Sequence, residues 1–294
     1  MTSTQDTSRS PLSAPVSVKH RVRTPSGDVQ AVEWPVADAA QDAPTVVLAH
    51  GWTLSSASWH PVLEAVLRRR AVRVVAFDQP GHGGSAPVGR APTVHELGEV
   101  LHRVITAVAP AGPLVLAGHS MGGMTVMAYA AEHGDDVRDR VRGVVLVSTA
   151  AAVGRRARIP MESLAMGASS RAPRVALGRM LPTRAQTRLL YGSGVEDAVA
   201  APGLQLIRST PLPTIGRWFT ALQSHDERAA LAHLDGVPTR ILVGAQDRLT
   251  PVRLSRELDA AIHASRLTVL PGAGHMLTYE APDPVADAIV DLLP

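Results

Sequence analysis

Short runs of apolar, often β-branched residues alternate along the chain with longer segments in which apolar residues recur every three or four positions. The short runs are typical of strands and the longer segments of amphipathic helices. Because strands and helices alternate, we predict an α/β fold with a mostly parallel sheet of about eight strands and helices on both faces. The predicted strands are residues 16–23, 29–35, 45–49, 72–77, 114–117, 141–147, 239–243 and 267–270. The first two, joined by Pro25-Ser26-Gly27-Asp28, indicate an antiparallel hairpin at the sheet edge.

Several predicted helices carry local start and stop signals. Residues 93–96 read Thr-Val-His-Glu, a capping box, and the apolar residues that follow lie on one helical face. Thr250-Pro251 and Asp283-Pro284 each place a good N-cap residue before a proline at the first helical position. The segment 121–133 is followed by Gly134, which we predict to be its C′ glycine.

The alternation stops after residue 149 and resumes only near residue 238. We predict that 150–225 is a helical cap, or lid, inserted into an α/β core made of 16–149 and 226–294. We expect such an insertion to cover the carboxyl ends of the strands, where open α/β sheets bind ligands. Its short helices are expected near residues 159–169, 173–181, 183–191, 203–209 and 213–223. Residues 1–15 are polar and rich in Pro and Ser, so we expect a disordered leader.

Composition excludes several classes of protein. The chain has 294 residues, 45% of them hydrophobic, and no cysteine, so it has neither disulfides nor a thiolate metal site nor a cysteine nucleophile. The leader lacks the apolar segment of a signal peptide, and no run approaches about 18 apolar residues, so we expect a cytoplasmic protein without a membrane span. The pI near 9.9 accompanies a net charge of only +3. Without a basic helix bearing aromatics, no nucleic-acid partner is predicted.

The positive charge is concentrated in the predicted cap. Residues 150–225 hold ten arginines and three acidic residues, whereas the rest of the chain is slightly acidic. We favour solvated faces of short helices as the role of these arginines, and attraction of an anionic substrate is the alternative. The apolar residues of this segment either line an acyl pocket or form the core of the cap, and both interpretations stay open. They include Met161, Leu164, Met166, Leu189, Leu190, Trp218, Phe219 and Leu222.

A serine between two glycines follows the predicted strand 114–117. The sequence there is Gly118-His119-Ser120-Met121-Gly122. A serine on a sharp strand-to-helix turn adopts strained backbone angles, and the neighbouring glycines allow other backbone to approach closely. We therefore predict that Ser120 is a nucleophile with its hydroxyl exposed at the end of the strand.

A serine hydroxyl needs a base to accept its proton, and the base needs an acid that orients it. Two later strands supply both groups. Asp247 follows the apolar residues 241–243, and His275 follows residues 267–270 in a loop rich in glycine. The order Ser120, Asp247, His275 is nucleophile, acid and base, as in hydrolases with this serine turn.

With these residues the chain resembles the α/β-hydrolase fold family, of the esterase, lipase and C–C hydrolase kind, over residues 16–293. The segment Leu48-Ala49-His50-Gly51-Trp52 ends the third strand, and the resemblance implies that the backbone N–H groups of Trp52 and Met121 form the oxyanion hole. We also predict that His50, Gly51, His119 and Met276 lie at the substrate pocket. Asp78, in the loop after the fourth strand, is expected to bond loop amides.

The predicted function is a serine hydrolase that cleaves a carboxylic ester through an acyl-enzyme. Its partner is a small-molecule acyl substrate, apolar or partly anionic, and no metal or cofactor is implied because no metal-ligand motif occurs. Perhydrolysis, as in cofactor-free haloperoxidases, and thioester or C–C hydrolysis use the same residues and stay open. A non-catalytic ligand-binding protein is the alternative of another class. Monomer and homodimer are both compatible with the sequence.

Overall fold

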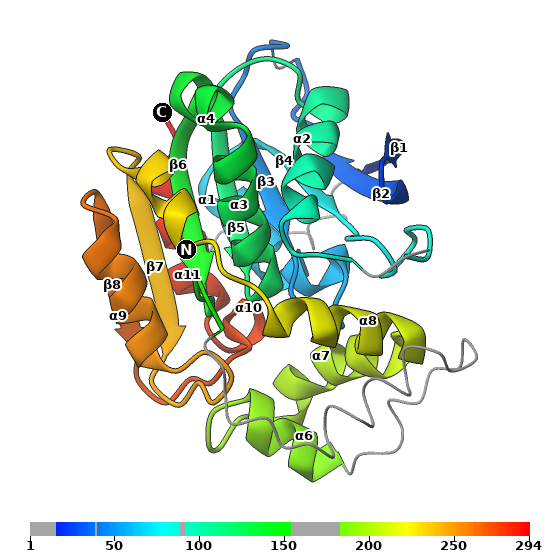
Figure 1. Cartoon of the computed structure of the whole chain (residues 1–294), viewed down its shortest axis with the longest axis vertical. Helices are drawn as coiled ribbons and strands as arrows, with labels where there is room; N and C mark the ends of the chain where they lie inside the picture. The colour runs from blue at the N-terminus through cyan, green and yellow to red at the C-terminus, as the bar shows by residue number, and fades with distance from the viewer. Residues whose placement is uncertain (1–15, 39, 89–91, 154–182) are drawn as a thin grey trace, which may run out of the picture.

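The computed structural model describes residues 16–38, 40–88, 92–153 and 183–294. They contain one eight-stranded sheet in the order β1-β2-β4-β3-β5-β6-β7-β8 (Figure 1). β2 pairs antiparallel with β1 and β4, and every other pair is parallel, so the predicted mostly parallel α/β sheet is confirmed. The strands are β1 Val18–Thr24, β2 Gly27–Trp34, β3 Thr45–Ala49, β4 Arg73–Phe77, β5 Leu114–His119, β6 Val141–Val147, β7 Thr239–Gly244 and β8 Ser265–Leu270.

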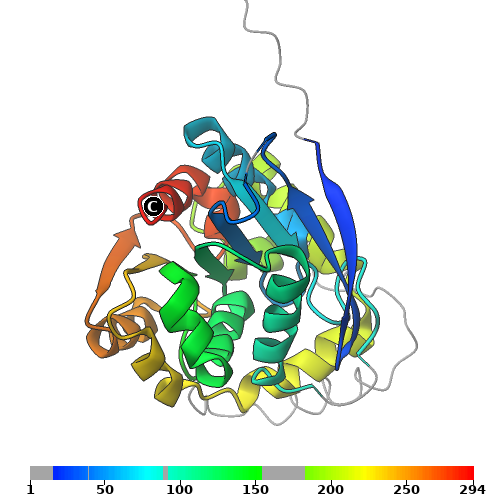
Figure 2. The ribbon, with the colours of Figure 1, turned by 90° about the horizontal axis from the view of Figure 1, so that it is seen from above.

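Helices cover both faces of the sheet (Figures 1 and 2). Alternate strand residues point to opposite faces, so Val46 and Leu48 of β3 pack in one apolar cluster and Val47 and Ala49 in another. The first cluster includes apolar residues of α1 (His60–Arg69) and α11 (Pro282–Val290). The second includes those of α2 (Glu96–Val108), α3 (Met121–Glu132) and α9 (Val252–Ala261). Burial on both faces explains why the central strands are continuously apolar.

The predicted helix signals are confirmed only in part. The Thr93 hydroxyl accepts the Glu96 N–H at 3.3 Å and the Glu96 carboxylate accepts the Thr93 N–H at 3.4 Å, which is the predicted capping box. Gly134 is not a C′ glycine, because it begins a further helix, α4 (Gly134–Arg140). Asp283 lies inside α11 rather than at its N-cap. Thr250 does not cap α9 either, and its hydroxyl bonds the Asp247 carboxylate instead.

Three further helices lie beyond the carboxyl ends of the strands, at the bottom of Figure 1. They are α6 (Thr183–Leu190), α7 (Asp197–Ser209) and α8 (Leu212–Gln223).

Some predictions fall outside the described residues. They are the leader 1–15, the helices near 159–169 and 173–181, and the arginines between 155 and 179. The shorter elements are the 3-10 helices η1 (Ser56–Trp59) and η2 (Arg228–Leu234) and the helix α10 (Leu277–Glu280). Within the described ranges, no helix is both long and apolar enough to cross a membrane.

Candidate active site

Ser120 occupies a strained turn between β5 and α3. Its φ of 53° and ψ of −118° lie in a region that side-chain-bearing residues rarely adopt, at a cost of about 1–3 kcal/mol. Hydrogen bonds hold the turn, because the Ser120 N–H donates to the Val147 carbonyl at 2.9 Å and its carbonyl accepts the Thr149 hydroxyl at 2.7 Å. The surrounding sheet and helix therefore maintain the strain at the carboxyl end of β5.

The two glycines flanking Ser120 are required by close backbone contacts. A Cβ on Gly122 would lie 2.0 Å from the Ala49 carbonyl oxygen, and one on Gly118 would lie 2.3 Å from the Gly122 carbonyl oxygen. Both neighbours are backbone atoms of buried elements, so they cannot move aside as a flexible side chain can. The glycine pattern is thus explained by packing of α3 against β3 and β5.

Replacing Gly122 with alanine is expected to lower the free energy of unfolding by about 3 kcal/mol or more, because the added Cβ clashes with β3. Urea unfolding of the purified protein measures the change. Gly236→Ala is the matched control, since Gly236 has a φ of +81° but open space around it, and strain alone costs about 1–2 kcal/mol. A smaller loss for Gly122→Ala than for Gly236→Ala would contradict the packing argument.

Asp247 and His275 meet at the same edge of the sheet. Asp247 lies in the turn after β7, His275 lies in the loop after β8, and the His275 Nδ1 is 2.9 Å from the Asp247 Oδ2. Both side chains are buried. Because a carboxylate only accepts hydrogen bonds, Nδ1 carries the proton and the Nε2 of the imidazole keeps its lone pair.

The Asp247 carboxylate also accepts three hydrogen bonds from its own turn. Its Oδ1 accepts the N–H groups of Leu249 at 2.9 Å and Thr250 at 2.8 Å, and its Oδ2 also accepts the Thr250 hydroxyl at 2.8 Å. Burial pushes the pKa of Asp247 upward, but the facing His275 and the hydrogen bonds from His275 and Thr250 outweigh burial, so the pKa is below its ordinary value. The ionised form is therefore the one that the site holds.

The loop after β3 lies against Ser120. A Cβ on Gly51 would be 3.3 Å from the Ser120 Cβ, so this part of the loop borders the serine directly. Trp52 follows Gly51, and its indole packs on Phe219 of α8 at 5.9 Å between ring centroids. Met121 is the first residue of α3, so its N–H has no partner inside the helix and lies at the positive end of the helix dipole.

His119 connects the serine turn to the His275 loop. Its Nε2 donates to the His275 carbonyl at 2.9 Å, and the two rings are 5.0 Å apart. Within the described part of the chain, the buried Nδ1 has no hydrogen-bond partner. Burial, and then the neighbouring His275, lower the pKa of His119 to about 3, so the ring is neutral. A substrate contact by His119 stays a prediction.

His50 and Met276 face other parts of the protein. The fully buried His50 ring donates through Nδ1 to the Gly51 carbonyl at 2.7 Å and accepts the Gln79 N–H at Nε2 at 2.8 Å. It therefore has no free nitrogen to offer a substrate. The Met276 side chain is buried in an apolar cluster that includes Leu204 of α7. Contacts of these residues or of Gly51 with a substrate stay predictions.

Asp78 bonds backbone amides as expected. Its Oδ1 accepts the Ser56 N–H at 2.7 Å and its Oδ2 accepts the Gly84 N–H at 2.8 Å. The carboxylate thereby ties the loop after β4 to the loop after β3, next to the serine turn.

Four buried histidines are expected to make stability depend on pH. Burial is the largest cause that lowers the pKa of His50, His82, His119 (to about 3) and His225 (to about 4). In the unfolded chain each has a pKa of about 6.5, so between that pH and the lower folded value only the unfolded state binds the proton. Their stabilising contribution is complete above about pH 6.5 and falls as pH falls, by about 1.4 kcal/mol per pH unit for each histidine.

Urea unfolding at pH values between 4 and 7 measures this slope. His225→Gln is expected to flatten it, whereas the exposed His263→Gln serves as the control. Equal slopes in wild type and His225→Gln would show that burial of His225 does not have this effect.

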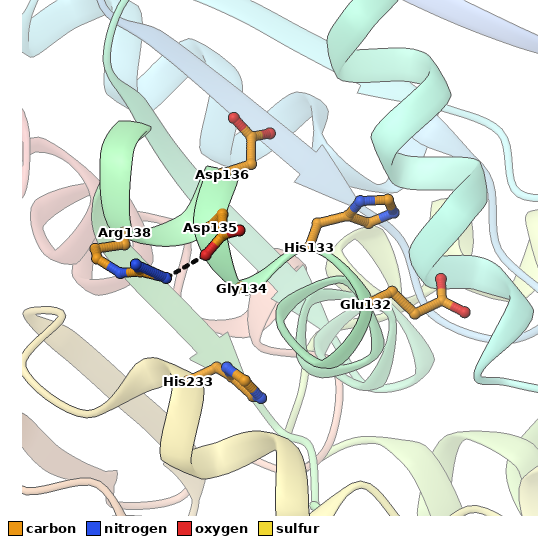
Figure 3. A pocket seen from close by; sticks show the side chains of 7 residues that line it. All are labelled: Glu132, His133, Gly134, Asp135, Asp136, Arg138 and His233. Carbon is orange, nitrogen blue, oxygen red and sulfur yellow. Dashed lines mark hydrogen bonds and ion pairs between the residues drawn. The ribbon is translucent and has the colours of Figure 1, made fainter.

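A second region of polar side chains lies at the far end of α3, roughly 18 Å from Ser120 along a twelve-residue helix. Glu99, Glu132 and His133 bring possible metal-ligand atoms within 4.8 Å of one another. His133 pairs with Glu99 at 3.2 Å and His95 with Glu132 at 3.2 Å, so ion pairing accounts for the cluster. The adjacent pocket, about 370 Å³ in volume, is shown in Figure 3 with its lining residues Glu132, His133, Gly134, Asp135, Asp136, Arg138 and His233.

Comparison with known proteins agrees with the fold. The sequence profile described as alpha/beta hydrolase fold matches residues 44–282. A non-heme haloperoxidase of Rhodococcus erythropolis is 29% identical over 83% of this chain and 90% of its own length. A monoacylglycerol lipase of Mycolicibacterium smegmatis is 30% identical over 80% of this chain and 82% of its own.

Among solved structures, the enol-lactonase of Burkholderia xenovorans LB400 superposes with a TM-score of 0.78 at 22% identity, covering 93% of this chain and 99% of that one. The matching family and the lipase relative are those of a hydrolase. The chain belongs to the α/β-hydrolase fold family.

Proposed function

We propose that the protein is a serine hydrolase that cleaves a carboxylic ester of a small molecule. The observation that carries this proposal is the buried Asp247–His275 hydrogen bond at the sheet edge where the strained Ser120 stands. These are the three groups that acyl transfer needs: a nucleophile, its base, and the acid that orients the base. The haloperoxidase and lipase relatives support a hydrolase of this kind.

In the proposed reaction the Ser120 Oγ attacks the ester carbonyl carbon while the His275 Nε2 takes the hydroxyl proton. The N–H groups of Trp52 and Met121 donate to the oxyanion of the tetrahedral intermediate. His275 then gives its proton to the departing alkoxide, which leaves as the alcohol and an acyl-Ser120. Water attacks the acyl carbon as His275 again removes a proton, and return of that proton to the Ser120 oxygen releases the acid.

We propose that 150–225 acts as a cap over this site and presents it with apolar surface. Of the described part, the Trp52–Phe219 contact brings α8 to the loop beside Ser120. Among the described arginines of this segment, Arg208 donates to the Thr183 hydroxyl and Arg217 donates to the Val88 carbonyl. Arg184 and Arg188 are exposed. These contacts support an apolar acyl group over an anionic one.

An ester series tests the proposed activity. We expect kcat/KM for p-nitrophenyl esters to rise from acetate to butyrate by about fourfold per methylene, because each buried CH₂ contributes about 0.8 kcal/mol. Folding is checked by circular dichroism. Absence of turnover by folded protein would overturn ester hydrolysis, and a flat series would overturn the apolar pocket.

The haloperoxidase relative supports perhydrolysis as a second candidate function. In that reaction acetic acid acylates Ser120 with loss of water, and hydrogen peroxide then replaces water as the attacker of the acyl-enzyme, so acetic acid and hydrogen peroxide yield peracetic acid and water. Peracid formation that exceeds ester hydrolysis at matched substrate concentrations would favour this candidate.

A further inference from the structure

One carboxylate accepts three backbone amides around His275. The Glu280 Oε2 accepts the N–H groups of Gly192 at 2.7 Å and Gly274 at 2.9 Å, and its Oε1 accepts the Met276 N–H at 3.0 Å. Glu280 is the last residue of the short helix α10, whereas Gly192 follows α6. The two residues on either side of His275 are thereby bonded to the same side chain.

The His275 amide is held by α6 itself. Its N–H donates to the Leu190 carbonyl at 2.7 Å, so the consecutive amides of residues 274–276 are all engaged. The backbones are in direct contact, because a Cβ on Gly192 would lie 1.8 Å from the Gly272 carbonyl oxygen. A Cβ on Gly274 would lie 2.5 Å from the Tyr191 carbonyl carbon. The end of α6 therefore packs against, and hydrogen-bonds to, the loop that carries the proposed base.

The same stretch also reaches the loop of the proposed acid. The Ser193 N–H donates to the Gln246 side chain at 2.8 Å, and the Arg248 guanidinium donates to the carbonyls of Arg188 and Tyr191. Residues 188–193 thus bridge the two loops that bring Asp247 and His275 together.

We propose that Glu280 is a positioning residue for His275. It fixes the base loop against residues 188–193, and this inference rests on the proposed function. A charged acceptor shared by three amides holds the loop more firmly than neutral hydrogen bonds do. A base displaced by about 1 Å loses on the order of 10²-fold in rate, so the carboxylate acts on kcat although it touches no reacting atom.

Two variants of Glu280 test this role. Glu280→Ala removes all three acceptor bonds, and we expect kcat to fall about 100-fold with KM within about twofold of wild type. Glu280→Gln retains one oxygen that can accept the Gly192 and Gly274 amides but turns an NH₂ group toward the Met276 amide, so we expect an intermediate loss. Glu257→Gln, on the exposed face of α9, is the matched control and is expected to keep wild-type kcat.

A measurement independent of turnover accompanies the kinetics. The His275 Nδ1 proton, bonded to Asp247, is expected to give a downfield ¹H NMR resonance that stays sharp in wild type and Glu257→Gln and broadens in Glu280→Ala through faster exchange. An unchanged resonance in folded Glu280→Ala would overturn the positioning role, whatever the activity. A rise in KM at constant kcat would overturn it as well. Absence of turnover in wild type with the expected NMR change would count against the proposed function alone.

Discussion

Ser120→Ala is expected to lower kcat for ester hydrolysis by about 10⁴-fold or more and to abolish covalent labelling by a fluorophosphonate probe. The reason is that no other hydroxyl occupies the strained turn at the end of β5. The fold is expected to remain because alanine differs from serine only by the hydroxyl oxygen. Labelling is followed on gels with a fluorescent probe, and residual turnover by the initial rate with p-nitrophenyl butyrate.

Ser255→Ala is the matched control for the nucleophile. Ser255 is a buried serine of α9 whose hydroxyl has no hydrogen-bond partner among the described residues, so its loss changes little. Labelling that persists in Ser120→Ala would assign the nucleophile to another residue. A folded wild-type protein that takes up no probe would favour the non-catalytic binding hypothesis.

Asp247→Asn is expected to lower kcat by about 10³- to 10⁴-fold while leaving KM and the fold nearly unchanged. The Leu249 and Thr250 amides both donate to Oδ1, so the asparagine must place its carbonyl oxygen there. Its NH₂ group then faces His275 Nδ1 and donates to it. The imidazole consequently carries its proton on Nε2 and cannot accept one from Ser120.

The exposed Asp291→Asn controls for loss of a carboxylate elsewhere. The tautomer itself is read from ¹⁵N chemical shifts of the histidines, which distinguish a protonated Nδ1 from a protonated Nε2. Full activity of Asp247→Asn would move the acid to a different residue, and an unchanged tautomer with low activity would contradict the orientation argument.

Where sequence prediction succeeded, the determining interactions are local. The positions of the central strands follow from short runs of apolar residues, because neighbours such as Val46 and Val47 are buried on opposite faces of one sheet. The capping box of α2 spans four residues and formed as predicted. The serine turn was also predictable, since Gly118 and Gly122 lie within two residues of Ser120. Both positions make backbone contacts that leave no room for a Cβ.

Where sequence prediction failed, a neighbouring group or segment took the place of the predicted cap. The Thr250 hydroxyl satisfies the local pattern of an N-cap, yet in the structure it donates to the Asp247 carboxylate, which also needs donors to remain ionised in a buried site. Gly134 follows α3 as a C′ glycine would, but the chain turns directly into α4. Neither outcome is visible in the few residues on which a capping prediction depends.

The sequence by itself determined the succession of strands and helices along the chain, the serine turn, and the candidate nucleophile, acid and base after three of the strands, because each is recognised from a pattern of a few neighbouring residues. Only the tertiary structure decided how those groups are held. The Glu280 carboxylate accepts hydrogen bonds from the N–H groups of residues 192, 274 and 276. The His275 N–H donates to the carbonyl of Leu190, 85 positions earlier in the chain. Such contacts form only when folding brings remote segments of backbone together, so hydrophobic periodicity in the sequence does not predict them.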